Sequence, residues 1–311
     1  MPLDPLAKRL LTIMAAATPA DRSRPSVEAR RQSLARLMQF ARAEAAGVNA
    51  TDGTLPGPGG EIRYRVYSPA DMPEHAPGFV FFHGGGLVAG SIETHDRIAA
   101  ALAHSTGCRL ISVDYRLAPE HKFPAAVEDA IAATEWVARE ASSLGIDASR
   151  LVVGGDSAGA TLAAVVCQEA LQNAGLSLVA QCLICPVLNF EETSPSREAF
   201  AENHLIDRFT IEADLADYLP DDADLADPKI SPLRAARLAG LPQAIIHTAE
   251  FDPMRDEGNA YARKLLAAGV AVEHICHEGM VHNFHAMGAL LPQAQLVLSQ
   301  IGEQVRRAVK S

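Results

Sequence analysis

The chain has 311 residues, a length that fits one large α/β domain or about two smaller ones. Hydrophobic residues make up 48% of it and charged residues 21%, and this composition excludes a disordered or fibrous protein. The net charge of −11 and the pI near 5.4 argue against nucleic acid as a partner, because an acidic surface repels phosphates.

The N-terminal sequence does not predict a membrane segment. No apolar run in the chain approaches the ~18–20 residues that a transmembrane helix requires. Lys8 to Ala17 has the outline of a secretory signal, but Asp4 lies where such a signal is basic and Thr12 interrupts its apolar stretch. We therefore expect a cytoplasmic protein without membrane attachment.

The first elements along the chain are helices, a linker and a strand. Residues 1–46 have the apolar spacing of helices, and the arginines from Arg30 to Arg42 are interpreted as a solvated helix face. Gly47 to Gly60 is rich in glycine and proline and predicts a linker. From Glu61 the apolar residues alternate with polar ones, as in an antiparallel strand.

Beyond this strand, short apolar runs alternate with helix-like stretches. This order is typical of βαβ units, and it predicts a mostly parallel sheet with helices on both faces. Residues 187–233 interrupt the alternation with an acidic, proline-containing segment, which we interpret as a cap or lid insertion. The predicted strands are 79–82, 110–113, 151–153, 179–185, 244–247 and 270–275, and the predicted helices include 95–105, 124–140, 158–173 and 256–268.

A nucleophile motif follows the strand at 151–153. Gly155 to Gly159 has the pattern G-x-S-x-G and leads from that strand into a helix. A serine at such an elbow needs glycine two residues to either side, because the tight turn leaves no room for a side chain. We therefore predict Ser157 as a nucleophile, with the N–H of Ala158 directed toward an oxyanion at the helix N-terminus.

A block of glycines follows the strand at 79–82. In His83 to Gly86, backbone N–H groups can approach a ligand oxygen without obstruction by side chains. The spacing of Gly84, Gly86 and Ala89 also fits a loose dinucleotide-binding pattern. That interpretation lacks an acidic residue about 20 residues further on and leaves the serine elbow unexplained. We favour an oxyanion pocket.

A serine nucleophile needs a base and a carboxylate that orients it, and in this architecture they follow in the order Ser, Asp or Glu, His. Asp252 comes just after the strand at 244–247, and His282 lies in a loop after the last predicted strand. We assign these two residues as the carboxylate and the base. Their competitors are Glu250 and Asp256 for the carboxylate, and His277 and His285 for the base.

Neither histidines nor cysteines predict a metal site. Four histidines lie between residues 274 and 285, but they lack the H-E-x-x-H pattern of a zinc site. Cys182 and Cys185 have the spacing of a zinc or redox pair, yet they lie in a predicted strand, where residues three apart face opposite sides. We interpret both as buried structural cysteines. The acidic run Asp221 to Asp227 lacks the glycine and glutamate of a calcium loop.

With these residues assigned, the chain resembles the bacterial hormone-sensitive-lipase-like esterases of the α/β-hydrolase fold over nearly its whole length. Three positions depart from the common pattern: Leu87, where an aromatic residue often follows the glycines, Ala160, where a second glycine often follows the elbow, and Asn283, where glycine often follows the histidine. They affect the pockets, so the preferred substrate cannot be carried over. The resemblance is carried by Leu3–Pro5, His83–Gly86, Asp114–Glu120, Gly155–Gly159, Asp252–Gly258 and Gly279–His282.

The resemblance implies an eight-stranded, mostly parallel sheet that carries a helical cap. We expect a catalytic domain at 51–186 and 231–311, with a cap formed by 1–50 and an insertion at 187–230. The family pattern also implies a set of site residues: the catalytic triad Ser157, Asp252 and His282, and oxyanion N–H donors from Gly85, Gly86 and Ala158. We expect Leu87 and Asp156 to contact the substrate.

The sequence therefore predicts a serine carboxylesterase that hydrolyses small, short-acyl esters through an acyl-enzyme. It needs no cofactor, its partner is the small-molecule ester, and its activity falls below roughly pH 6 to 7 because the base must be neutral. A homodimer through the last strand is a family-level expectation. Two alternatives stay open: hydrolysis of a lactone, amide or thioester by the same residues, and a non-catalytic small-molecule receptor on the same fold.

Overall fold

The computed structural model describes residues 2–17, 24–42, 45–173 and 175–310. These residues form an eight-stranded sheet in the order β1-β2-β4-β3-β5-β6-β7-β8, in which β2 is antiparallel to both of its neighbours and every other pair from β4 to β8 is parallel. The mostly parallel sheet is confirmed. The strands are β1 Val48–Gly57, β2 Gly60–Pro69, β3 Ala76–Phe82, β4 Arg109–Asp114, β5 Ile146–Asp156, β6 Ala180–Ile184, β7 Gln243–Phe251 and β8 Val272–Val281.

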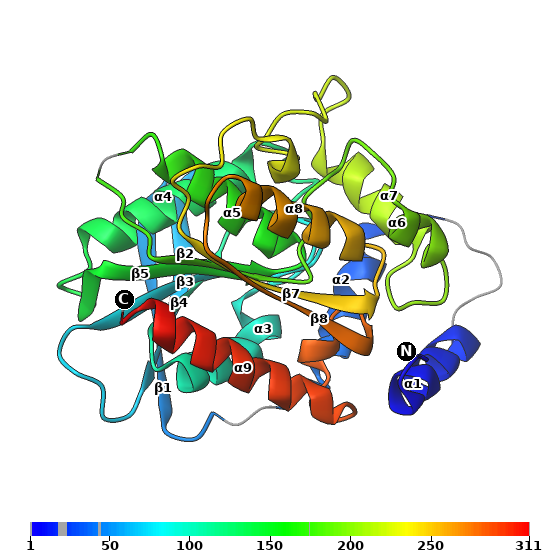
Figure 1. The fold of residues 1–311 in the computed structure, drawn as a ribbon, viewed down its shortest axis with the longest axis horizontal. Coiled ribbons are helices and arrows are strands. Elements are labelled where there is room, and N and C mark those ends of the chain that lie inside the picture. The colour runs from blue at the N-terminus through cyan, green and yellow to red at the C-terminus, as the bar shows by residue number, and fades with distance from the viewer. Residues whose placement is uncertain (1, 18–23, 43–44, 174, 311) are drawn as a thin grey trace.

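Helices cover both faces of the sheet (Figure 1). On one face α4, α5 and α8 pack against a core that includes the side chains of Val80 and Val153, and on the other α3 and α9 pack against Phe79 and Phe81. The two cores arise because successive residues of a buried strand point to opposite faces. The helices are α1 Pro5–Ala17, α2 Val27–Met38, α3 Ile92–Thr106, α4 Ala125–Arg139, α5 Ala158–Ala170, α6 Pro195–Ala199, α7 Arg208–Tyr218, α8 Arg255–Ala267 and α9 Pro292–Ala308, with short 3₁₀ turns η1 Pro232–Arg234 and η2 Phe284–Ala286.

The predicted linker at Gly47 to Gly60 is wrong. Most of it is β1, which pairs along its whole length with β2, from Val48 opposite Pro69 to Gly57 opposite Gly60. An edge strand tolerates both glycine and proline, so their number in this segment does not exclude a strand. The antiparallel strand predicted from Glu61 is confirmed as β2.

The interpretation of the N-terminal arginines as a solvated face is also wrong in part. Arg30, on α2, is 7% exposed and forms ion pairs with Asp214 and Asp217 on α7. Arg31 pairs with Glu120 and donates to the carbonyl oxygen of Val88. The helix before the sheet is thus joined to the inserted segment by ion pairs between a buried arginine and two half-buried aspartates.

The inserted segment carries α6 and α7 and lies beside α2 at one end of the sheet (Figure 1). Because the carboxyl ends of parallel strands share one edge of a sheet, the residues that follow β3, β5, β7 and β8 meet below these helices. No helix among the described residues is long and apolar enough to cross a membrane.

Candidate active site

Three side chains from three distant segments meet at this edge of the sheet. The Nε2 atom of His282 lies 3.0 Å from the Oγ atom of Ser157, and its Nδ1 atom lies 2.8 Å from the Oδ2 atom of Asp252. All three side chains are buried. Both distances are those of hydrogen bonds, so the imidazole joins the hydroxyl to the carboxylate in one continuous chain.

The backbone at Ser157 is strained in the way that the elbow motif predicts. Its φ of 52° and ψ of −120° lie outside the regions that a non-glycine residue ordinarily adopts. A Cβ on Gly159 would overlap the carbonyl oxygen of Phe82, and one on Gly155 would lie 2.5 Å from that same oxygen. Glycine at these two positions therefore allows the elbow to pack against the end of β3.

The glycine loop after β3 is held next to the elbow. Gly84 donates its N–H to the Oδ1 atom of Asp156 at 2.9 Å, and the hydroxyl of Tyr115 donates to the carbonyl oxygen of His83 at 2.7 Å. Gly85 and Gly86 have φ values of 127° and 66°, which favour glycine. Within the described part of the chain, the N–H groups of Gly85, Gly86 and Ala158 have no hydrogen-bond acceptor. They are available to a ligand oxygen.

Asp156 was expected to contact the substrate, but its carboxylate lies behind the glycine loop. It is fully buried and lines neither of the cavities at Ser157. Its Oδ2 atom lies 3.5 Å from Nε2 of His95 and 3.6 Å from Nε2 of His285. Burial acts to raise the pKa of Asp156, but the two imidazoles outweigh burial and hold the pKa below its ordinary value. The contacts of Asp156 indicate that it holds the glycine loop in place.

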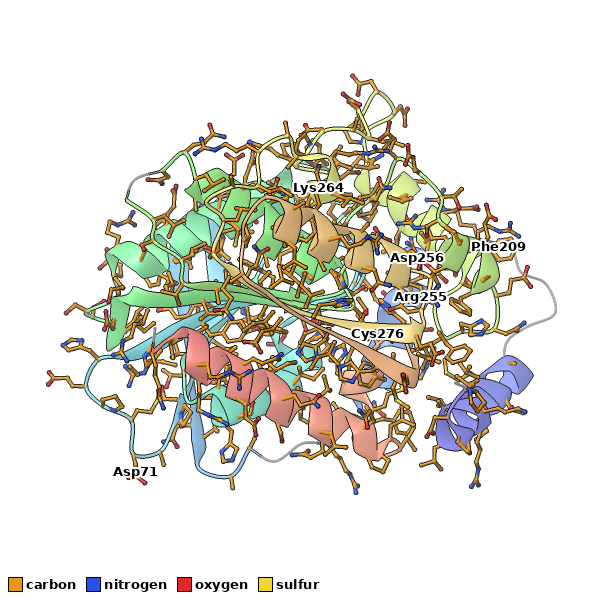
Figure 2. The ribbon with its side chains drawn as sticks, in the orientation of Figure 1. Asp71, Phe209, Arg255, Asp256, Lys264 and Cys276 are labelled. Atoms are coloured by element: carbon orange, nitrogen blue, oxygen red, sulfur yellow. The ribbon has the colours of Figure 1, made fainter. Side chains whose placement is uncertain are left out.

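The two other candidates for the orienting carboxylate accept hydrogen bonds from backbone N–H groups instead of from His282. Glu250 accepts a hydrogen bond from the N–H of Gly279 at 2.7 Å. Asp256 lies at the start of α8, where Figure 2 labels it. It accepts a hydrogen bond from the N–H of Ser196 at 2.9 Å and so binds the first turn of α6. Asp252 is the carboxylate that contacts His282.

The competing histidines also have other partners. His277 is hydrogen-bonded to His247, with 2.8 Å between the Nε2 atom of the first and the Nδ1 atom of the second. His285 lies beside Asp156, with 3.6 Å between its Nε2 atom and the Oδ2 atom of the carboxylate. The imidazole that reaches Ser157 is that of His282.

The electrostatic surroundings favour a basic imidazole at His282. Burial acts to lower the pKa of His282, but the charge and the hydrogen bond of Asp252 outweigh burial, so the pKa is raised above its ordinary value. Such a group accepts a proton from a neighbouring hydroxyl more readily than an ordinary histidine does.

A thiol completes the surroundings of Asp252. The ligand atoms of Cys185, Asp252 and His282 lie within 4.8 Å of one another, close enough for a metal ion. However, burial and the charge of Asp252 raise the pKa of the Cys185 thiol well above its ordinary value, and metals bind the thiolate. The donor set therefore fits a hydrogen-bonded triad better than a metal ion. Cys182 and Cys185 are both buried, as expected.

Two cavities open from Ser157. The larger, of about 240 Å³, is bordered by His282, by Gly85 and Gly86, and by apolar residues of α2. The smaller, of about 40 Å³, is bordered by Ala158, by the predicted substrate contact Leu87 and by α7. Asp214 lines both cavities, and Arg30 lines the larger.

Two residues of the cavities were not predicted as such: Arg30 was interpreted as solvated, and nothing in the sequence singled out Asp214. They lie 184 positions apart in the chain, and neither belongs to a motif. Only the placement of α7 over α2 brings the two charges together. The opposite charges of the arginine-rich segment from Arg30 to Arg42 and of the acidic insertion were the one available signal.

Comparisons with known proteins agree with this geometry. Residues 79–286 match the model of a family described by its α/β-hydrolase fold. The carboxylic ester hydrolase LipN of Mycobacterium tuberculosis is 44% identical over 243 residues, covering 76% of this chain and 64% of LipN, so the chain spans less than two thirds of that relative. An arylesterase of Saccharolobus solfataricus is 37% identical over 91% of this chain and 92% of its own length.

A solved structure extends the similarity to the whole fold. The hyperthermophilic esterase of the archaeon Pyrobaculum calidifontis superposes with a TM-score of 0.93 at 38% identity, covering 99% of this chain and all of that one. The chain belongs to the α/β-hydrolase fold family, and its esterase relatives confirm the predicted resemblance to the hormone-sensitive-lipase-like members.

Proposed function

We propose that this protein is a serine carboxylesterase that hydrolyses small esters with short acyl chains. The observation that carries the proposal is the hydrogen-bonded chain from Ser157 through His282 to Asp252, next to the free N–H groups of Gly85, Gly86 and Ala158. A hydroxyl with a base on one side and amide donors on the other is the arrangement that acyl transfer requires.

The geometry assigns each group a step. His282 removes the proton of Ser157 as the hydroxyl oxygen attacks the ester carbonyl carbon, and Asp252 fixes the imidazole tautomer and stabilises the imidazolium. The three N–H groups stabilise the negative charge that develops on the carbonyl oxygen. The protonated His282 then gives its proton to the leaving alcohol, and a water molecule repeats the sequence on the acyl-enzyme to release the acid.

The two cavities correspond to the two halves of an ester. The leaving alcohol must lie beside His282, which borders only the larger cavity, of about 240 Å³. The acyl group then occupies the smaller cavity, of about 40 Å³, between Leu87, Ala158 and α7. A cavity of this size accepts a few carbon atoms, so we propose a narrow acyl preference, whereas the larger cavity leaves more room for the alcohol.

A series of p-nitrophenyl esters tests this function. We expect acetate and butyrate to give the highest kcat/KM, and octanoate to lose about tenfold or more, because a long chain cannot enter the smaller cavity. The variant Ser157→Ala should lose activity on every ester and serves as the control. Absence of hydrolysis across the series would contradict the esterase proposal, and a maximum at octanoate would contradict the acyl preference.

Three further expectations belong to the same proposal. We propose that residues 1–50 and 187–230 act together as a cap over the site, and the ion pairs between α2 and α7 support this. A cytoplasmic location and a homodimer stay predictions, which cell fractionation and sedimentation equilibrium would test.

A further inference from the structure

Asp214 occupies an unusual position, at the junction of the two cavities. It lies on α7, lines both cavities, and its side chain is 16% exposed. No other carboxylate among the described residues lines either cavity. The hydrolysis step does not require an acidic side chain in the lining of these cavities, and the ion pair with Arg30 uses only one of the two carboxylate oxygens.

The two carboxylate oxygens of Asp214 have different surroundings. Oδ1 forms the ion pair with Arg30. Oδ2 lies against the glycine loop, where a Cβ on Gly86 would overlap it, and none of the described residues donates a hydrogen bond to it. Oδ1 is thus bound to Arg30, and Oδ2 is available to a ligand beside Gly86, one of the proposed oxyanion donors.

The charges around Asp214 balance. Arg30 also pairs with Asp217, which in turn pairs with Arg24 at 2.6 Å, so two arginines face two aspartates. Burial, against the opposing effect of Arg30, raises the pKa of Asp214 to about 7. A hydroxyl suits this group in either state, because it can donate to the carboxylate or accept from the carboxylic acid. An ammonium group would suit only the charged state.

The larger cavity has both polar and apolar side chains in its lining, as a ligand with a hydroxyl on a short carbon chain requires. Ser33 and Thr210 line it together with Asp214, while Leu34 and Leu37 form its apolar side. The smaller cavity offers a hydroxyl fewer partners: apart from Asp214, Ser157 and Tyr218, the described residues that line it are apolar or glycine. A hydroxyl that reaches Asp214 therefore belongs to the alcohol half of the ester.

We propose that Asp214 binds a free hydroxyl on the alcohol half of the substrate, close to the ester oxygen. The preferred substrates are then short-acyl monoesters of alcohols that carry a second hydroxyl. This inference rests on the proposed esterase function and adds the class of alcohol to it.

A pair of esters of equal size tests the inference. Ethylene glycol monobutyrate and propyl butyrate have the same number of non-hydrogen atoms and differ by a hydroxyl in place of a methyl group. We expect the wild-type protein to prefer the glycol ester by about tenfold in kcat/KM, since a site built around a hydrogen bond discriminates against a ligand that lacks it. In Asp214→Leu the preference should vanish or reverse, and in Asp214→Asn, which keeps an oxygen acceptor, part of it should remain.

Asp217→Leu is the matched control. Asp217 pairs with the same arginine but lines neither cavity, so this variant weakens the ion cluster and leaves the hydrogen bond to the substrate in place. Its preference for the glycol ester should equal that of the wild type. Because each preference is a ratio of two rates on one protein, loss of folded material cancels from it.

The possible failures are distinguishable. Equal rates on the two esters in the wild type, an unchanged ratio in Asp214→Leu, or an equal loss of preference in Asp217→Leu would each overturn the inference. Failure to hydrolyse both esters and p-nitrophenyl butyrate would instead overturn the esterase function on which it rests.

Discussion

Among single residues, His282 is central to the site, because its imidazole joins the hydroxyl of Ser157 to the carboxylate of Asp252. Ser157, Asp252 and His282 were predictable because a strand-to-helix elbow and the loops after parallel strands restrict where chemistry can occur. Arg30 and Asp214 were not, because each acquires its role only when α7 is placed over α2. Asp156 lies within the elbow motif, but its contacts with Gly84 and two histidines depend on tertiary structure.

The raised pKa of His282 predicts the acid limb of the pH profile. The imidazole acts as a base only when neutral, and the charge of Asp252 keeps it protonated to a higher pH than an isolated histidine. The kcat/KM of the wild type should therefore rise with pH, with a midpoint above ~6.5, the ordinary pKa of histidine. A midpoint well below that value would show that burial outweighs Asp252.

At the scale of elements, strands buried on both faces were the most predictable, since they are short continuous apolar runs between helices. The strand β1 was not, because Val48–Gly57 has few apolar residues and is held by pairing with β2. The inserted segment was recognised as an interruption. Its attachments to the rest of the fold were not predictable, because they depend on tertiary contacts such as the ion pairs of Arg30 with α7 and the bonds of a buried glutamate of α8.

That glutamate is Glu257, and replacing it should destabilise the protein. Its Oε2 atom accepts hydrogen bonds from the N–H groups of Leu188 and Asn189, at 2.7 and 2.5 Å, and its Oε1 atom pairs with Arg197 at 3.0 Å. Glu257→Gln weakens these charge-assisted bonds and should lower the free energy of unfolding by about 1–3 kcal/mol.

Denaturant unfolding measures this loss. The exposed Glu212, on α7, provides the control, and Glu212→Gln should stay within about 0.5 kcal/mol of the wild type. Equal stability of Glu257→Gln and the wild type would mean that the buried glutamate does not hold the start of the insertion.

At the scale of the whole molecule, buried neutral histidines link stability to pH. His247 bridges Gln304 on α9 and His277 on β8, with 2.8 Å at each hydrogen bond. Burial lowers the pKa of His247 to about 3 and that of His277 to about 4. Between these values and the ordinary ~6.5, the unfolded chain binds protons that the folded chain does not, so stability falls as the pH falls.

We therefore expect a lower free energy of unfolding at about pH 5 than at about pH 7.5. His277→Gln should reduce this difference, and the matched change at the exposed His104, His104→Gln, should leave it unchanged. A wild-type protein equally stable at both pH values would rule out the buried chain of imidazoles as a source of acid sensitivity.

Labelling with a fluorophosphonate, followed by peptide mass spectrometry, shows whether Ser157 is an activated nucleophile. The probe forms a covalent bond only with a serine that an adjacent base activates beside an oxyanion pocket. We expect one adduct, on Ser157, that His282→Ala strongly reduces. An adduct on another serine, or labelling of Ser157 that does not depend on His282, would contradict this expectation.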